Sequence, residues 1–254
     1  MLLAALGALL ALAGVAGAEQ RPPVVVGGQQ PTLTLEPSVS PRTLSKTKTS
    51  QIDLSLRSQF VVPEGAGFPP ALDRLRLLLD RHLELSTPGL PTCDPRLQIE
   101  LGNPVTQRCR PALVGIGEID LYLVYPEGKP LRLQTELPFY NAGTQGGVTR
   151  FWAYFMVPIP IPAPVFVPVK LRRINAGRYG TEVLIPMPKI ADGHGLTESL
   201  TLRIDRRYGF KGRQRSVATF RCANGKFLAA GEAAFVNGIK AAVPAALQTC
   251  GVAR

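Results

Sequence analysis

The sequence has few of the residues and motifs on which enzymes depend. It holds only two histidines in 254 residues, and none of the G-x-S-x-G, H-E-x-x-H, phosphate-loop or G-x-G-x-x-G motifs occurs. Histidine is the side chain whose charge changes most readily near neutral pH. We therefore expect a protein that is not an enzyme and has no cofactor and no metal centre, and we rank a hydrolase without a recognisable motif third among the functions.

The two histidines are the remaining candidates for such chemistry. Asp80, His82 and Glu84 alternate along the chain, and on one side of a strand they could hold a metal or form a charge relay. A solvated strand face or a turn explains this spacing better. His194 lies in Asp192-Gly193-His194-Gly195, which is typical of a surface turn.

Long apolar runs are absent after the first eighteen residues. Residues 1–18 carry no charge and end in Ala16-Gly17-Ala18, a small-residue cleavage site, so they are interpreted as a signal peptide although no Lys or Arg precedes the apolar run. Residues 19–30 are expected to be a flexible leader. The next most apolar stretch, Phe151 to Val169, contains five prolines, so we expect no transmembrane segment after signal cleavage.

The four cysteines form neither a C-x-x-C motif nor a zinc-ligand spacing. An even number of cysteines behind an export signal predicts two disulfides. Three pairings are possible, and proximity in the sequence favours Cys93–Cys109 and Cys222–Cys250. These features predict an extracytoplasmic protein that is secreted or associated with the cell envelope.

Many short strands are expected from the 25 glycines and 24 prolines, which show no fixed period. Apolar residues alternate with polar ones in segment after segment, as at Ile52, Leu54 and Leu56. We predict an all-β fold with ten or more antiparallel strands in a sandwich or barrel, forming a single β domain over 31–254. One segment, Ala71 to Ser86, fits either a helix or two strands with a turn at Asp80–His82.

The stretch from Ser199 to Cys222 is interpreted as a long hairpin that turns at Lys211-Gly212-Arg213. Its inward face would carry Leu200, Leu202, Ile204, Ala218 and Phe220. Its outward face would be cationic, and nearby strands would extend that face. The anion-binding candidates are Arg203, Arg207, Arg215, Arg221, Arg172 and Arg178.

Positive charge is concentrated in this part of the chain. From Lys170 to Lys226 there are 13 basic and 4 acidic residues, a net of +9 out of +11 for the whole chain. Concentrated positive charge attracts polyanions, and the partners that we expect are anionic lipid or wall polymer. Aromatic residues are too sparse to favour nucleic acid. A solubilising face that also keeps sheet edges apart is the simpler alternative.

A second feature is apolar. Phe151 to Met156 is aromatic, and Val157 to Val169 alternates apolar residues with proline. Proline is excluded from central strands, which predicts an edge, a polyproline II run or a loop tip. A pair of core strands is the simplest explanation. The functional explanations are a membrane-touching tip, a docking strand or the mouth of a lipid pocket. The lipid pocket leads to our second hypothesis, a carrier of a hydrophobic ligand.

Several short motifs also carry a resemblance. They are Gly89-Leu90-Pro91-x-Cys93, Cys109 with Ala112-Leu113-Val114-Gly115-x-Gly117, Gly177-Arg178-Tyr179-Gly180-Thr181, Pro188-Lys189-Ile190-Ala191-x-Gly193 and Tyr208-x-Phe210-Lys211-Gly212. In these the chain resembles a family of uncharacterised secreted β-rich proteins of high-GC Gram-positive (actinobacterial) bacteria. The resemblance implies two strands over Ala71 to Ser86, although the glycine of the family's turn is missing from Asp80-Arg81-His82. It implies no activity.

Overall fold

The computed structural model describes residues 31–126, 128–159 and 161–252. Strands make up 61% of it and helices 8%, so the predicted all-β class is confirmed. The expected signal peptide over 1–18 and leader over 19–30 lie outside the described residues. Within the described ranges, no helix combines the length and the apolar character needed to cross a membrane.

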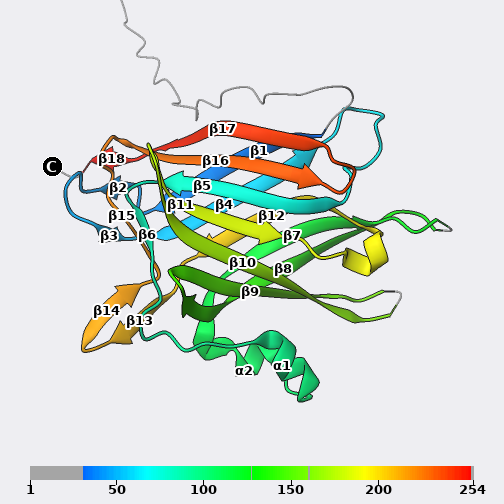
Figure 1. Ribbon diagram of the computed structural model, residues 1–254, viewed down its shortest axis with the longest axis horizontal. Coiled ribbons are helices and arrows are strands. Elements are labelled where there is room, and N and C mark those ends of the chain that lie inside the picture. Colours follow the sequence, from blue (N-terminus) through cyan, green and yellow to red (C-terminus); the bar gives the residue numbers. More distant parts are fainter. Residues whose placement is uncertain (1–30, 127, 160, 253–254) are drawn as a thin grey trace, which may run out of the picture.

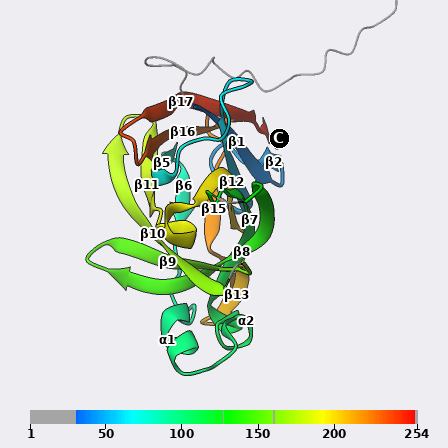
Figure 2. The ribbon, with the colours of Figure 1, turned by 90° about the vertical axis from the view of Figure 1, so that its right-hand side faces the viewer.

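Eleven strands form one curved sheet in which every neighbouring pair is antiparallel. In spatial order they are β1 (Thr32–Ser40), β4 (Asp53–Val61), β12 (Gly195–Ile204), β7 (Leu113–Leu123), β8 (Leu131–Gln145), β9 (Val148–Val157), β10 (Ala163–Ala176), β11 (Tyr179–Pro186), β5 (Leu72–Asp80), β16 (Lys226–Phe235) and β17 (Lys240–Thr249). Figure 2 shows how the sheet curls until its first and last strands lie together. The result is a nearly closed barrel.

The seam between β1 and β17 is the place where the barrel does not close by a main-chain ladder. β1 and β17 are the two edges of the sheet order, yet they contact each other. Across the seam, the backbone N–H of Val39 donates a hydrogen bond to the side-chain oxygen of Gln248. A side chain therefore links the two edge strands, which are not joined by a main-chain ladder.

Because the strands alternate in direction, the connections between them fall at two opposite ends. The connections 41–52, 81–112, 146–147, 177–178 and 205–225 share what we call the small-sheet end, named for three short strands that pair there. These are β3 (Ser50–Gln51), β15 (Ala218–Phe220) and β6 (Leu83–Leu85). A parallel pair, β18 (Gly251–Val252) with β2 (Thr43–Leu44), lies at the same end (Figure 1).

The connections 62–71, 124–130, 158–162, 187–194 and 236–239 share the other end. We call it the η2 end after the short 3-10 helix η2 (Ile190–Gly193), drawn in yellow at the right of Figure 1. One continuous cluster of buried apolar residues includes side chains from all eleven strands. It continues to Phe220 and Leu83 at the small-sheet end and to Ile190 at the η2 end.

Strand pairing shows what the segment Ala71 to Ser86 forms and explains where the prolines of β10 are tolerated. Ala71 to Ser86 forms β5 and β6 around a turn at Arg81–His82, so the two-strand alternative is confirmed. The prolines Pro164 and Pro168 lie in the half of β10 that pairs with β9. The ladder of β10 with β11 begins only at Lys170, so this half of β10 behaves as the edge that its prolines predict.

Two glycines in β7 let the backbone of β12 come close. A Cβ added to Gly117 would lie 1.8 Å from the carbonyl oxygen of Thr201, and one added to Gly115 would lie 2.2 Å from that of Arg203. The backbone of β12 therefore passes close to the start of β7, where a side chain would not fit. At this point the carbonyl of Val114 accepts hydrogen bonds from the N–H groups of Asp205 and Arg206.

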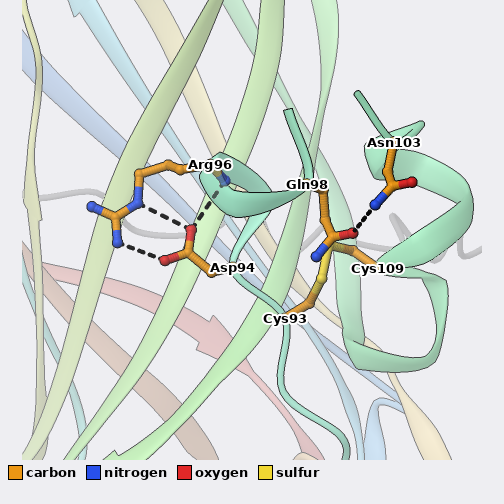
Figure 3. The surroundings of a disulfide bond; sticks show 6 residues. All are labelled: Cys93, Asp94, Arg96, Gln98, Asn103 and Cys109. Carbon is orange, nitrogen blue, oxygen red and sulfur yellow. Dashed lines mark hydrogen bonds and ion pairs between the residues drawn. A yellow bond between two sulfur atoms is a disulfide. The ribbon is translucent and has the colours of Figure 1, made fainter. Parts of the chain in front are cut away.

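Both predicted disulfides are present, Cys93–Cys109 and Cys222–Cys250. The first closes an excursion over 86–112 that contains α1 (Pro95–Glu100), α2 (Val105–Arg108) and the 3-10 helix η1 (Arg110–Ala112). Figure 3 shows Asp94, which caps α1 and pairs with Arg96, beside the disulfide. The excursion packs against the outer face of β8 and β9, where Arg96 lies 4.1 Å from the ring centre of Trp152.

Candidate anion-binding surface

The basic hairpin consists of β13 (Arg207–Phe210) and β14 (Arg213–Ser216), joined at Lys211-Gly212. It extends from the barrel at the small-sheet end (Figure 1). Between Arg206 and Ser216 the chain has five basic residues and no acidic one. Opposed pairs in the ladder include Tyr208 with Arg215 and Phe210 with Arg213, so aromatic and cationic side chains share one face of the hairpin.

The basic hairpin rests on the turn over 87–90. The Tyr208 hydroxyl donates a hydrogen bond to the carbonyl of Pro88 at 3.0 Å. Gly89 has φ +78°, and a Cβ at that residue would lie 2.0 Å from the ring of Phe210. Lys211 and Arg215 lie 5.4 and 5.5 Å from the centre of the same ring, within the range of cation–π attraction. These contacts hold the hairpin against the turn, while Lys211, Arg213 and Arg215 remain exposed.

This hairpin is shorter than the one predicted from Ser199 to Cys222. The predicted inward residues Leu200, Leu202, Ile204, Ala218 and Phe220 are all buried, as expected. However, β12 pairs with β4 and β7, and β15 pairs with β3 and β6. The chain leaves the barrel wall at Asp205, so only residues 207–216 form the hairpin. The predicted single cationic sheet face is therefore wrong.

The six predicted arginines are instead divided between two places. Four of them, Arg207, Arg215, Arg221 and Arg178, lie in the connections at the small-sheet end, and Arg203 is one residue from the end of β12. Arg172 lies on the outer wall, in β10. Three of the six form ion pairs, namely Arg203 with Asp205, Arg207 with Asp53 and Arg172 with Glu182.

Arg203 and Arg207 also line a hollow of about 570 Å³ on the outer wall, which they share with Glu118 and Glu136. Acidic and basic side chains are mixed there, so this hollow attracts an anion less strongly than the hairpin does. The small-sheet end as a whole, rather than these two arginines, is therefore the candidate surface.

Charge is strongly divided between the two ends of the barrel. Leaving aside the excursion over 86–112, the connections at the small-sheet end hold eleven basic and two acidic residues, a net of +9. The basic ones are Arg42, Lys46, Lys48, Arg81, Arg178, Arg206, Arg207, Lys211, Arg213, Arg215 and Arg221. The described residues in the connections of the η2 end hold Lys129, Lys189, Glu64 and Asp192, a net of zero.

Most of these basic groups are available to a partner. Of the eleven, Arg207 alone makes an ion pair within the described part of the chain. Sequence reasoning missed Arg42, Lys46, Lys48 and Arg81, which come from connections far from the basic stretch. The signal that could have found them is strand direction, because in an antiparallel sheet alternate connections meet at one end.

The candidate residues Asp80, His82 and Glu84 lie at and around the turn between β5 and β6. Asp80 is buried and accepts hydrogen bonds from the backbone N–H groups of His82 at 2.9 Å and Leu228 at 3.3 Å. Burial raises the pKa of Asp80, and burial together with the charge of Arg221 lowers the pKa of His82. Glu84 lies beyond the turn, in β6. No group of three acidic, histidine or cysteine residues that could hold a metal occurs in the described part of the chain.

His194 also has a structural setting. It ends η2, its Nδ1 lies 3.1 Å from the carbonyl oxygen of Val124, and its ring lies against that of Tyr125 at 4.9 Å. It thus helps to attach η2 to the neighbouring connection. Comparison with protein-family models, with curated proteins and with solved structures found no match to this chain.

Proposed function

We propose that this is an exported, non-enzymatic protein of the cell envelope that binds a polyanion through the small-sheet end. Anionic lipid headgroups and anionic wall polymers share the chemistry that this end would recognise, which is closely spaced phosphate or carboxylate groups. The observation that carries the proposal is the net charge of +9 in the connections of one end, leaving aside the excursion over 86–112, against zero in the described connections of the other.

The physical basis is the number of contacts rather than the strength of any one. An exposed ion pair contributes only about 0–1 kcal/mol. Many basic groups that face one polyanion act together, because each contact releases a counterion from the polymer. Such binding weakens steeply as salt rises.

Two further observations support this location and this mode of binding. Both disulfides are formed, which fits an oxidising compartment outside the cytoplasm. Buried side chains from all eleven strands meet in one cluster inside the barrel. This packing favours binding at the outer surface over the alternative of a carrier whose ligand lies within the barrel.

The proposal is tested with two triple variants that remove the same net charge. One is Lys48→Ser, Arg213→Ser and Arg215→Ser at the small-sheet end. Its matched control is Lys129→Ser, Lys189→Ser and Lys240→Ser, at or next to the η2 end. Binding is measured by co-sedimentation with vesicles containing phosphatidylglycerol and by retention on immobilised polyphosphate, so that the two arms distinguish lipid from polymer.

We expect the first variant to bind at least tenfold more weakly and the control to bind like the unchanged protein. Binding of the unchanged protein should fall by at least roughly tenfold between about 50 and 200 mM salt. Equal loss in both variants would mean that only total charge matters. If the unchanged protein bound neither probe at low salt, the proposal would be wrong and the small-sheet end would be a solubilising surface.

A further inference from the structure

A second group of basic side chains lies on the barrel wall, away from both ends. On the outer face of three adjacent strands, the ladders place Lys170 of β10 beside Leu184 of β11, and Leu184 beside Arg76 of β5. Arg172 lies beside Glu182 in the same ladders, and Arg74 beside Pro186. All of these side chains except Pro186 border a hollow of about 420 Å³, together with Val148 and Glu232.

Glu182 fixes two of these basic groups in place. Its two carboxylate oxygens accept one hydrogen bond each, from the Nε atoms of Arg76 at 2.6 Å and Arg172 at 2.5 Å. Burial opposes ionisation of Glu182, but the two guanidinium groups outweigh it and hold the pKa of this carboxyl below its ordinary value. Glu182 is only 9% exposed, whereas Arg76 and Arg172 are 41% and 61% exposed.

The arginines therefore remain open to a ligand. The hydrogen bonds to Glu182 use the Nε atoms, and the terminal nitrogens of both guanidinium groups are the donors that suit a planar or tetrahedral oxyanion. Arg74 and Lys170 add two basic groups that make no ion pair within the described ranges of the chain.

Charge identifies the class of ligand. Arg74, Arg76, Lys170 and Arg172 contribute +4, and Glu182 and Glu232 contribute −2, so the hollow has a net charge of +2. A phosphomonoester carries about −1.5 to −2 at pH 7. A volume of about 420 Å³ exceeds what one phosphate fills and lies in the range of small-molecule sites, roughly 300–1,000 Å³.

We propose that this hollow binds a small phosphomonoester of about the size of a sugar phosphate. Arg76 and Arg172 hold the phosphate, Arg74 and Lys170 complete its charge, and Leu184 and Val148 contact the carbon skeleton. None of these basic residues lies in the connections at the small-sheet end. The site is therefore independent of the polyanion-binding surface.

The test uses calorimetric titration of the mature, disulfide-bonded protein with glucose 6-phosphate and, in parallel, with inorganic phosphate. The wall variant is Arg74→Ser with Lys170→Ser, which leaves both ion pairs of Glu182 intact. Its control is Lys48→Ser with Arg213→Ser, which removes the same charge from the small-sheet end. Thermal melting verifies that each variant is folded.

We expect glucose 6-phosphate to bind more tightly than inorganic phosphate, and the wall variant to lose at least tenfold in affinity while the control loses nothing. The wall variant should still bind polyphosphate. Absence of binding to the unchanged protein, or equal loss in both variants, would overturn the site.

A third variant separates a fixed geometry from simple attraction. Glu182→Gln raises the net charge of the hollow by one, so unspecific attraction predicts tighter binding. The site predicts weaker binding by several-fold, because Arg76 and Arg172 lose the carboxylate that orients them. Tighter binding of glucose 6-phosphate by this variant would overturn the proposal.

Discussion

At the scale of single residues, two features make direct predictions: the glycine at the contact between β7 and β12, and the carboxylate that two arginines share. Gly117 allows β12 to pass within contact distance of β7 because it has no Cβ. Glu182 joins β11 to both of its neighbours, since its partners Arg76 and Arg172 lie in β5 and β10.

Gly117→Ala is expected to lower the free energy of unfolding by about 2–3 kcal/mol, as overpacking against a fixed neighbour does. The new methyl group would lie 1.8 Å from the backbone oxygen of Thr201, which cannot move without shifting β12. Denaturation by urea measures the loss. Gly209→Ala, with nothing within 4 Å of the new atom, is the control and should change the value by less than about 0.5 kcal/mol. Equal effects would contradict the close approach.

Glu182→Gln should show a stability difference that depends on pH. The pKa of Glu182 in the folded protein lies below its ordinary value of 4.5. Its contribution is therefore complete above that value and is lost as pH falls through the lower, folded-state pKa. Melting temperatures at pH 7, 5 and 3 should converge with those of the unchanged protein as pH falls. A constant difference across this range would show that the ion pairs do not contribute.

Sequence reasoning at this scale worked where a pattern is local. Alternation was sufficient to predict the burial of Leu202 and Phe220. It could not show that Arg207 is paired, because its partner, Asp53, lies 154 residues away. Ion pairs between distant strands depend on the sheet order, which alternation does not determine.

At the scale of elements, the basic hairpin shows the same limit. A period of two is the same whichever strand lies alongside, so the pattern from Ser199 to Cys222 predicted strands correctly and their pairing incorrectly. β12 pairs with β7, and β15 pairs with β6, so these two strands do not pair with each other. The four cysteines were easier to pair because the partners are near in sequence, 16 and 28 residues apart.

Gly89→Ala should release the basic hairpin from the barrel without changing any charge. The added atom would lie 2.0 Å from the ring of Phe210, and Gly89 has positive φ. We expect trypsin to cleave at Lys211, Arg213 and Arg215 at least several-fold faster. The matched control is Gly65→Ala, which has a similar φ of +79° and no neighbour within 4 Å. Unchanged cleavage in Gly89→Ala would mean that the hairpin is not held by this contact.

At the scale of the whole molecule, charge is divided along the barrel axis. The sequence located most of the net positive charge between Lys170 and Lys226, but it could not show that Arg42, Lys46 and Lys48 join it. That required the directions of eleven strands and the ends at which their connections fall. The fold class was predictable from alternation, and the assembly of the surface was not.

This division of charge predicts that the protein contacts an anionic surface with the small-sheet end only. When the protein is bound to vesicles containing phosphatidylglycerol, Lys46, Lys48 and Lys211 should be protected from acetylation. Lys129, Lys189 and Lys240, at or next to the η2 end, should react as they do in solution. Mass spectrometry of the modified peptides gives the extent of each reaction. Equal protection of both groups would contradict an oriented complex.

The seam between β1 and β17 also imposes an order in time. β1 ends at Ser40 and β17 begins at Lys240, so about 200 residues must be synthesised between them, which takes roughly 10–40 s at the usual rates. Throughout that interval β1 has no neighbour on its free edge. The barrel therefore cannot close until β17 has been synthesised, and until then the outer edge of β1 stays open to pairing with another strand.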